Sequence, residues 1–239
     1  MTDARPARQG ITDLAEPAGL IFDLDGTLVD TVDARIAAWL QTFEEVGIPA
    51  DRPHVAGLIG ADGKRLAREV AEVSGRRLSD EVAEAVDRRA GERYDDINTD
   101  PAPLPGAREL LALLHGSDLP WALATSSRAD QVTVSVRALG LADGAPVIDG
   151  SQVNEAKPAP DLLINAADRI GVPGHRCWYV GDSTWDMLAA RAARMLGIGL
   201  PTGAVSAASL QVAGASVVLA SLTELTAELH RRGHLAARP

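Results

Sequence analysis

The chain has one cysteine, no long apolar run and no excess of basic side chains. Cys177 has no second cysteine with which to form an intramolecular disulfide, which fits a reducing compartment. No apolar run approaches the length of a membrane span. The formal net charge of -10 and the pI near 4.9 argue against nucleic acid or an anionic membrane as the main partner. An anionic substrate would therefore need positive charge supplied locally by its binding site.

The N-terminal segment lacks the features of a signal peptide. Residues 1–19 contain charged residues, proline and glycine, but no apolar stretch. We therefore expect a cytoplasmic protein in which residues 1–18 are disordered.

Beyond residue 104, short apolar runs alternate with longer amphipathic segments. This alternation is typical of an α/β fold with a doubly wound parallel sheet. Strands are predicted at 121–124, 147–148, 178–180, 198–200 and 217–219, and helices at 105–115, 129–139, 160–170, 184–194 and 222–231.

A helical block interrupts this series directly after the first predicted strand. Apolar residues recur at helical spacing between residues 32 and 96, whereas residues 98–105 carry three prolines in a polar setting that is typical of a linker. A chain of 239 residues is long enough for a core and a smaller second domain. We predict that residues 19–30 and 104–239 form the core and that residues 31–103 form an inserted helical cap domain.

The first predicted strand ends in two aspartates and a glycine. Residues 20–22 are apolar, and Asp23, Asp25 and Gly26 follow directly. In an open α/β sheet, ligands bind beyond the carboxyl ends of the strands, where these carboxylates could bind a cation or attack a phosphoryl group. An acidic turn that only caps the strand is the alternative. An EF-hand loop is excluded, because a third oxygen ligand and a terminal bidentate glutamate are missing.

Three further segments place polar side chains next to predicted strands. Thr125 and Ser126 could bind phosphate oxygens, although taken alone they are more typical of a helix cap. Lys157, in a proline-rich loop, could neutralise a transferring phosphoryl group or could be a solvated surface lysine. Asp182 and Asp186 lie about one helical turn apart at a strand-to-helix junction, where capping explains one of them but hardly both.

Together these segments resemble the four signature motifs of the haloacid dehalogenase-like superfamily. The resemblance covers nearly the whole chain from residue 19. The helical block resembles the cap that phosphoglycolate phosphatase-like and β-phosphoglucomutase-like members insert between the first and second motifs. The motifs occur in the family's order, as Asp23-Leu24-Asp25-Gly26-Thr27, Thr125, Lys157 with Pro158, and Gly181-Asp182 through Asp186.

The resemblance implies a phosphomonoester hydrolase that works through an aspartyl phosphate. By analogy, Asp23 is the nucleophile, Asp25 is the general acid and base, and Lys157 neutralises charge. Thr125 and the adjacent Ser126 would bind the phosphoryl oxygens. Gly26, in the first motif, is predicted to bind substrate as well.

The resemblance also implies a Mg2+ site. The expected ligands are the Asp23 carboxylate, the Asp25 backbone carbonyl and Asp182. Asp186 would act through water or by positioning Lys157.

Single residues separate the subclasses of the family. Asp25 argues against dehalogenase and phosphonatase members, and Gly181 lies where mutase members tend to carry an acidic residue. We therefore predict a phosphatase for a small phosphorylated metabolite, such as a sugar phosphate or a phosphoglycolate-like compound. A phosphosugar mutase and a non-catalytic binding module are the alternatives.

Specificity is expected to come from the cap, because the core motifs contact only the phosphoryl group. The turn at residues 60–65 is the candidate loop, in which Lys64 or Arg65 would meet the leaving group, and Arg128 could line the entrance. Solvated cations on a helix surface account for all three equally well. We expect a monomer or a weak homodimer with neither nucleic acid nor membrane as a partner.

Overall fold

The main element of the fold is a six-stranded parallel sheet. The structure is a computed structural model, and it describes residues 10–141, 144–153 and 155–235. The strand order is β5-β4-β1-β6-β7-β8, and the paired strands run parallel throughout. The strands are β1 (Gly19–Phe22), β4 (Trp121–Ala124), β5 (Val147–Ile148), β6 (Cys177–Gly181), β7 (Leu196–Gly199) and β8 (Val217–Val218).

Helices cover both faces of the sheet. Leu20 and Phe22 of the central strand β1 belong to one apolar cluster, whereas Ile21 belongs to a second cluster on the opposite face. Side chains that alternate between two covered faces are typical of a doubly wound sheet, so the predicted fold class is confirmed. One face is covered by α5 (Ala107–His115), α6 (Ala129–Ala138) and α10 (Leu222–Arg231), and the other by α7 (Asp161–Arg169) and α8 (Thr184–Ala192).

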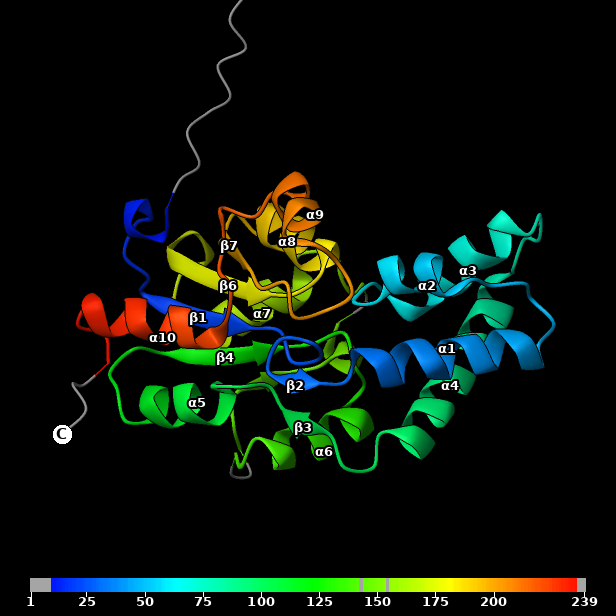
Figure 1. Cartoon of the computed structure of the whole chain (residues 1–239), viewed down its shortest axis with the longest axis horizontal. Helices are drawn as coiled ribbons and strands as arrows, with labels where there is room; N and C mark the ends of the chain where they lie inside the picture. The colour runs from blue at the N-terminus through cyan, green and yellow to red at the C-terminus, as the bar shows by residue number, and fades with distance from the viewer. Residues whose placement is uncertain (1–9, 142–143, 154, 236–239) are drawn as a thin grey trace, which may run out of the picture.

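Four helices form a separate part of the molecule, towards which the carboxyl ends of the central strands point (Figure 1). Their apolar side chains pack into a cluster of their own, to which α1 contributes Ile36, Trp39 and Phe43 at helical spacing. This helical region consists of α1 (Val32–Glu45), α2 (Arg52–Leu58), α3 (Gly63–Val73) and α4 (Asp80–Ile97).

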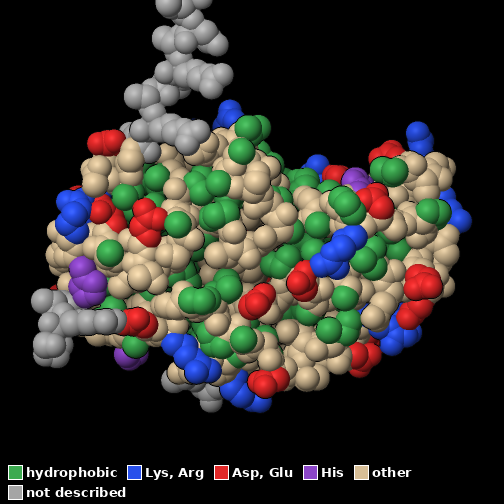
Figure 2. All heavy atoms as spheres, viewed as in Figure 1, with side chains coloured by type: hydrophobic (Ala, Val, Ile, Leu, Met, Phe, Trp, Pro, Cys, Tyr) green, Lys and Arg blue, Asp and Glu red, His purple; other side chains and the backbone are tan. Residues whose placement is uncertain are grey.

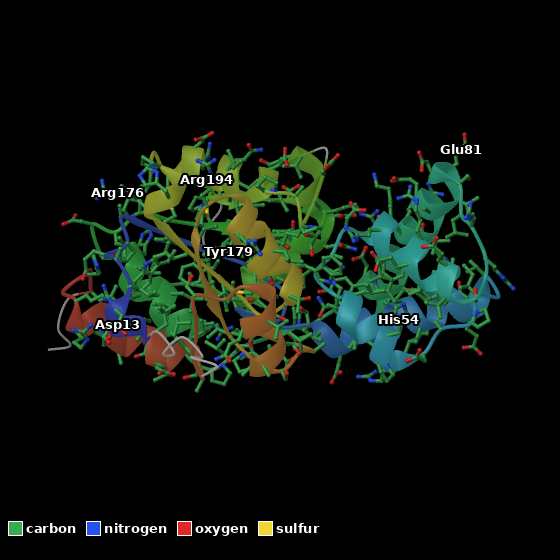
Figure 3. All side chains as sticks on the ribbon, turned by 90° about the horizontal axis from the view of Figure 1, so that it is seen from above. Asp13, His54, Glu81, Arg176, Tyr179 and Arg194 are labelled. Atoms are coloured by element: carbon green, nitrogen blue, oxygen red, sulfur yellow. The ribbon has the colours of Figure 1, made fainter. Side chains whose placement is uncertain are left out.

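The chain enters and leaves the helical region through two paired strands. β2 (Val29–Asp30) and β3 (Ala102–Pro103) are antiparallel to each other, which holds the two connections side by side. Viewed from above, Tyr179 lies within the sheet layer, whereas His54 and Glu81 lie in the helical region (Figure 3). The domain boundaries at residues 31 and 103 stay a prediction.

The described chain differs from the predicted elements at several points, and β2 and β3 were not predicted. Residues 10–18 were expected to be disordered, but Leu14 is buried in the main core and the carbonyl of Ala15 accepts a hydrogen bond from Trp178 Nε1 at 3.0 Å. The predicted disorder is therefore wrong for residues 10–18, and residues 1–9 lie outside the described residues. The structure also contains a helix that was not predicted, α9 (Ala207–Ala213).

The surface carries charged side chains of both signs. Acidic and basic side chains are interspersed on the face shown in Figure 2. Within the described ranges, no helix is both long and apolar enough to cross a membrane.

Leu20 tests the central position of β1. Leu20 is fully buried, so Leu20→Ala should lower the free energy of unfolding by about 2–5 kcal/mol in urea titrations. As a control, Val212→Ala changes a side chain on α9 that is 90% exposed, and it should alter that energy by less than about 0.5 kcal/mol. Equal losses for the two variants would contradict a buried β1.

Candidate active site

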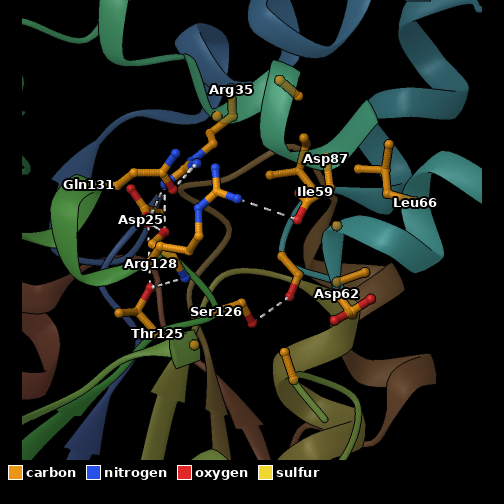
Figure 4. A pocket seen from close by; sticks show the side chains of 18 of the residues that line it. Asp25, Arg35, Ile59, Asp62, Leu66, Asp87, Thr125, Ser126, Arg128 and Gln131 are labelled. Carbon is orange, nitrogen blue, oxygen red and sulfur yellow. Dashed lines mark hydrogen bonds and ion pairs between the residues drawn. The ribbon is translucent and has the colours of Figure 1, made fainter. Parts of the chain in front are cut away.

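A cavity of about 320 Å³ lies between the carboxyl ends of the central strands and the helical region (Figure 4). Its walls come from segments that are far apart in the sequence, and all four predicted motifs contribute to it. Of the residues singled out from the sequence, it is lined by Asp23, Asp25, Lys64, Thr125, Ser126, Arg128, Lys157 and Asp182.

Three aspartates form a buried cluster beside this cavity. Oxygen atoms of Asp23, Asp182 and Asp186 lie within 4.8 Å of one another, and each side chain is at most 7% exposed. Asp23 and Asp182 are close because β1 and β6 are neighbours in the sheet, and α8 brings Asp186 back one turn later. A cluster of hard oxygen donors is the type of site that binds Mg2+ or Ca2+.

Lys157 is buried against this cluster. Its side chain is 1% exposed, and its Nζ donates hydrogen bonds to Asp23 and, at 2.8 Å, to Asp186 Oδ1. The alternative of a solvated surface lysine is therefore wrong. Its backbone carbonyl also accepts a hydrogen bond from Asp62 N at 3.0 Å, so the lysine loop is joined to the helical region.

Asp186 is held in place by several donors. Tyr179 Oη donates to Asp186 Oδ1 at 2.7 Å, and the Ser183 backbone N and Oγ donate to Oδ2 at 2.9 and 2.6 Å. With these partners and Lys157, this carboxylate has little hydrogen-bonding capacity left. Its direct contacts agree with a role in positioning Lys157.

The Asp182 carboxylate lies directly against the backbone of two glycines. It accepts a hydrogen bond from Thr27 Oγ1 at 2.9 Å. A Cβ atom added to Gly26 or Gly203 would come within 2.4 or 1.7 Å of Asp182 Oδ2, and Gly26 also has a φ of 80°. Gly26 is not among the described residues that line the cavity, so its predicted role in substrate binding stays a prediction.

The charges of the cluster are not balanced by protein groups. Burial raises the pKa of Asp23 to about 7, although Lys157 opposes the shift and Asp186 adds to it. Burial and the charges of Asp186 and Asp23 raise the pKa of Asp182 well above its usual range. For Asp186 the effect of burial is outweighed by Lys157, and the pKa is lowered. Three buried carboxylates beside one ammonium therefore fit a site that takes up a divalent cation.

Asp25 is not part of this cluster and is surrounded by donors. Thr31 Oγ1 and Tyr94 Oη donate to its Oδ1 at 2.8 and 3.1 Å, Arg35 Nη2 lies 3.3 Å from Oδ2, and Ser127 Oγ donates to Oδ2 as well. The Arg35 guanidinium also lies 3.5 Å from the centre of the Tyr94 ring. Arg35 and Tyr94 come from α1 and α4, so the helical region contributes directly to the surroundings of Asp25.

These donors determine the charge of Asp25. Burial alone would raise the pKa of Asp25, but Arg35 and the hydrogen bonds from Ser127, Thr31 and Tyr94 outweigh it and lower that pKa. Arg35 and Tyr94 were not predicted. Arg35 has no motif around it, and Tyr94 lies among the residues of helical spacing that predict only a helix.

Residues at the end of β4 and at the start of α8 connect the core to the helical region. Thr125 Oγ1 lies 3.5 Å from Asp25 Oδ2, and Ser126 Oγ donates to the carbonyl of Gly60 at 3.4 Å. Trp185 Nε1 donates to the carbonyl of Gly57 at 3.1 Å, and its ring belongs to the apolar cluster of the helical region. The turn predicted to reach the active site therefore does so.

The three cations proposed for specificity lie in different places. Lys64 lines the cavity and pairs with Glu84 at 3.4 Å, and Arg128 lines it and lies 3.8 Å from Asp87. Arg65 is not among the described lining residues. It pairs with Glu69 at 2.6 Å, and its guanidinium lies over the Trp185 ring.

Comparison with known proteins identifies the family. The family model for haloacid dehalogenase-like hydrolases matches residues 20–199. The chain therefore belongs to the haloacid dehalogenase-like hydrolases, which confirms the resemblance that the motifs indicate.

Two relatives and one solved structure illustrate the similarity. The fructose-1-phosphate phosphatase of Escherichia coli strain K12 is 30% identical, over 74% of this chain and 93% of its own length. The phosphoglycolate phosphatase of Xanthomonas campestris strain 8004 is 33% identical, over 75% of this chain and 80% of its own length. A hydrolase from Pseudomonas syringae has a TM-score of 0.85 and 34% identity, covering 89% of this chain and 98% of that one.

Asp182 tests the cation site without an activity assay. At about 100 times its Kd, Mg2+ should stabilise the native protein by about 2.7 kcal/mol, which corresponds to a rise in Tm of about 5–10 °C. Asp182→Asn removes one candidate ligand and should abolish most of this Mg2+-dependent rise in thermal-shift measurements. Asp118→Asn, at an exposed position, should retain it. An unchanged rise in Asp182→Asn would argue against the site.

Proposed function

We propose that this protein is a Mg2+-dependent phosphatase that hydrolyses a phosphomonoester of a small metabolite through an aspartyl phosphate. The observation that carries the proposal is the position of Asp23, which is buried at the end of β1, bonded to Lys157 and adjacent to two further aspartates. Aspartate is a competent nucleophile for phosphoryl groups, and phosphoryl transfer depends mainly on positioning and charge stabilisation. The phosphatase names of both relatives support this activity.

In the first step, a carboxylate oxygen of Asp23 forms a bond to phosphorus as the bond to the leaving oxygen breaks. Asp25 gives a proton to that oxygen, so that an alcohol departs. Lys157 offsets charge beside Asp23, while Thr125 and Ser126, which line the cavity at the end of β4, donate hydrogen bonds to the phosphoryl oxygens.

In the second step, water attacks the phosphorus and gives its proton to Asp25. The bond between phosphorus and Asp23 breaks, and inorganic phosphate is released. Asp25 is then protonated again, so the two steps together neither gain nor lose a proton. The ion pair with Arg35 and the hydrogen bond from Ser127 favour the ionised form of Asp25 in the absence of substrate, so the proton that it gives in the first step is taken up as the substrate binds.

The metal would be held by Asp23 and Asp182, with Asp186 beside them. The carbonyl of Asp25 is a further candidate by analogy with the family. When bound, Mg2+ supplies positive charge to the phosphoryl oxygens.

The phosphosugar mutase remains the second candidate within the family. Gly181 lies so close to Asp186 that an added Cβ would come within 2.5 Å of the Asp186 side chain. An acidic side chain at residue 181 would therefore displace Asp186, which favours the phosphatase. A non-catalytic binding module has no need for the buried arrangement around Asp23.

Asp23→Asn tests the nucleophile. With p-nitrophenyl phosphate and Mg2+, this variant should lose on the order of 10⁴-fold or more in kcat, because the amide cannot form the aspartyl phosphate. Wild-type protein should release free phosphate without an added bisphosphate, whereas a mutase would need one. Asp118→Asn is the control and should retain activity. Full activity in Asp23→Asn would refute the mechanism.

Arg35→Met tests the contribution of the helical region. The change leaves Asp25 with neutral donors only, and a hydrogen bond to a charged group is worth about 1.5–3 kcal/mol. We therefore expect kcat to fall by about 10-fold to 100-fold. Arg52→Met, which removes a half-exposed arginine on α2, should change kcat little. Equal rates for the two variants would show that Asp25 does not depend on Arg35.

A further inference from the structure

Much of the cavity wall is formed by the helical region. Trp39, Ile59, Leu66 and Ala90 provide an apolar side. The polar side contains three carboxylates and two cations, and it therefore has a formal surplus of one negative charge. These charged residues are Asp62, Lys64, Glu84, Asp87 and Arg128.

The Asp87 carboxylate occupies space that a side chain at residue 63 would fill, and Gly63 leaves this space free. A Cβ atom added to Gly63 would lie 1.9 Å from Asp87 Oδ1, so the carboxylate rests directly on the start of α3. The Asp87 side chain is 28% exposed, and burial raises its pKa although Arg128 opposes the shift. This carboxylate thus faces the cavity with limited access to bulk water.

Arg128 reaches the same place from the core. A Cβ atom added to Gly91 would lie 1.9 Å from Arg128 Nη2, so the guanidinium passes over the bare backbone of α4. Its Nη1 lies 3.8 Å from Asp87 Oδ2, and the two groups face each other in the cavity (Figure 4). An acceptor and a donor with five N–H groups therefore lie side by side in the part of the cavity wall that adjoins the helical region.

We infer that Asp87, together with Arg128, selects substrates whose leaving group is a neutral polyhydroxylated chain or ring, that is, sugar or polyol phosphates. This inference rests on the proposed phosphatase function. Asp87 accepts hydrogen bonds from substrate hydroxyls and Arg128 donates to them. The apolar side formed by Trp39, Ile59 and Leu66 faces the carbon skeleton.

The same wall disfavours a leaving group that carries a second negative charge. A substrate carboxylate would have to draw Arg128 or Lys64 away from Asp87 or Glu84, and it would then lie close to carboxylates that have lost their partners. A cationic leaving group is disfavoured because each of these three carboxylates already has a partner: Glu84 and Asp87 lie beside Lys64 and Arg128, and Asp62 accepts a hydrogen bond from a backbone N–H at the start of α3. Hydroxyl groups use both the donors and the acceptors that are present.

Two matched substrate pairs test this inference on the wild-type protein. Glycerol 3-phosphate is compared with 3-phosphoglycerate, and glucitol 6-phosphate with 6-phosphogluconate. Within each pair a hydroxymethyl group replaces a carboxylate. We expect kcat/KM to be at least about tenfold higher for the neutral member. Phosphoethanolamine serves as the cationic probe, and p-nitrophenyl phosphate as the general phosphatase substrate.

Asp87→Asn tests the residue itself. The amide keeps the shape of the side chain but removes its charge. We expect kcat/KM for the polyol phosphate to fall about tenfold and that for the phosphocarboxylate to rise, so that the ratio within a pair shrinks. A general loss of structure would lower both values. Asp96→Asn, on the same helix at a 70% exposed position, is the control and should keep the wild-type ratio.

Gly63→Ala provides a second variant. The added carbon should displace the Asp87 carboxylate without removing it, and it should therefore shift the ratio in the same direction as Asp87→Asn.

The outcomes separate this inference from the function on which it rests. No turnover of any substrate, including p-nitrophenyl phosphate, would overturn both. Hydrolysis of p-nitrophenyl phosphate with a preference for the phosphocarboxylates or for phosphoethanolamine would overturn the inference and leave the phosphatase in place. If the ratio of kcat/KM values within a pair is unchanged in both Asp87→Asn and Gly63→Ala, Asp87 does not contribute to substrate selection.

Discussion

The contact of the Lys157 ammonium with Asp23 and Asp186 is the interaction on which the active site depends. All three side chains are almost completely buried, and a buried charge is costly unless it is paired and hydrogen-bonded. The parallel sheet makes the pairing possible, because it places the ends of β1 and β6 side by side. The sheet places these three charged side chains next to one another, and the surrounding loops must pack closely enough to keep them paired.

The helical region completes the site and does more than cover it. It supplies two of the groups that hold Asp25, Arg35 and Tyr94, and its apolar cluster includes Trp185 from the core helix α8. Hydrogen bonds from Ser126 and Trp185 to backbone carbonyls of residues 57–60 join the two parts further. The Asp25 carboxylate is therefore held in this arrangement only while the helices lie against the core.

The parallel sheet and most of the active-site aspartates could be predicted, because they depend on patterns of residues that are close in the sequence. The first, second and fourth motifs follow apolar runs, and strands of a parallel sheet end at the same edge, so the meeting of Asp23, Thr125 and Asp182 follows from the topology. The helix α9 was missed because its small residues have weak periodicity. The two-residue strands β2 and β3 are too short to give a pattern at all.

The parts that could not be predicted depend on how one helix lies against another. Arg35 and Tyr94 are far apart in the sequence, and they meet at Asp25 only because α1 and α4 pack together. Lys64 and Arg65 are adjacent in the sequence, but only Lys64 lines the cavity, since neighbouring positions on a helix point in different directions. No local pattern determines which of two such residues faces a ligand.

The charge balance of the cavity supports the proposed role of a divalent cation. Among its described lining residues there are six carboxylates and four cations, a formal surplus of two negative charges. The cations are already paired: Lys157 with Asp23, Arg35 with Asp25, Lys64 with Glu84, and Arg128 with Asp87. A phosphomonoester would add further negative charge that these groups cannot offset without breaking their own pairs. In a chain with a net charge of -10, the proposed bound ion would supply positive charge for an anionic substrate, and the cluster of Asp23, Asp182 and Asp186 could hold it.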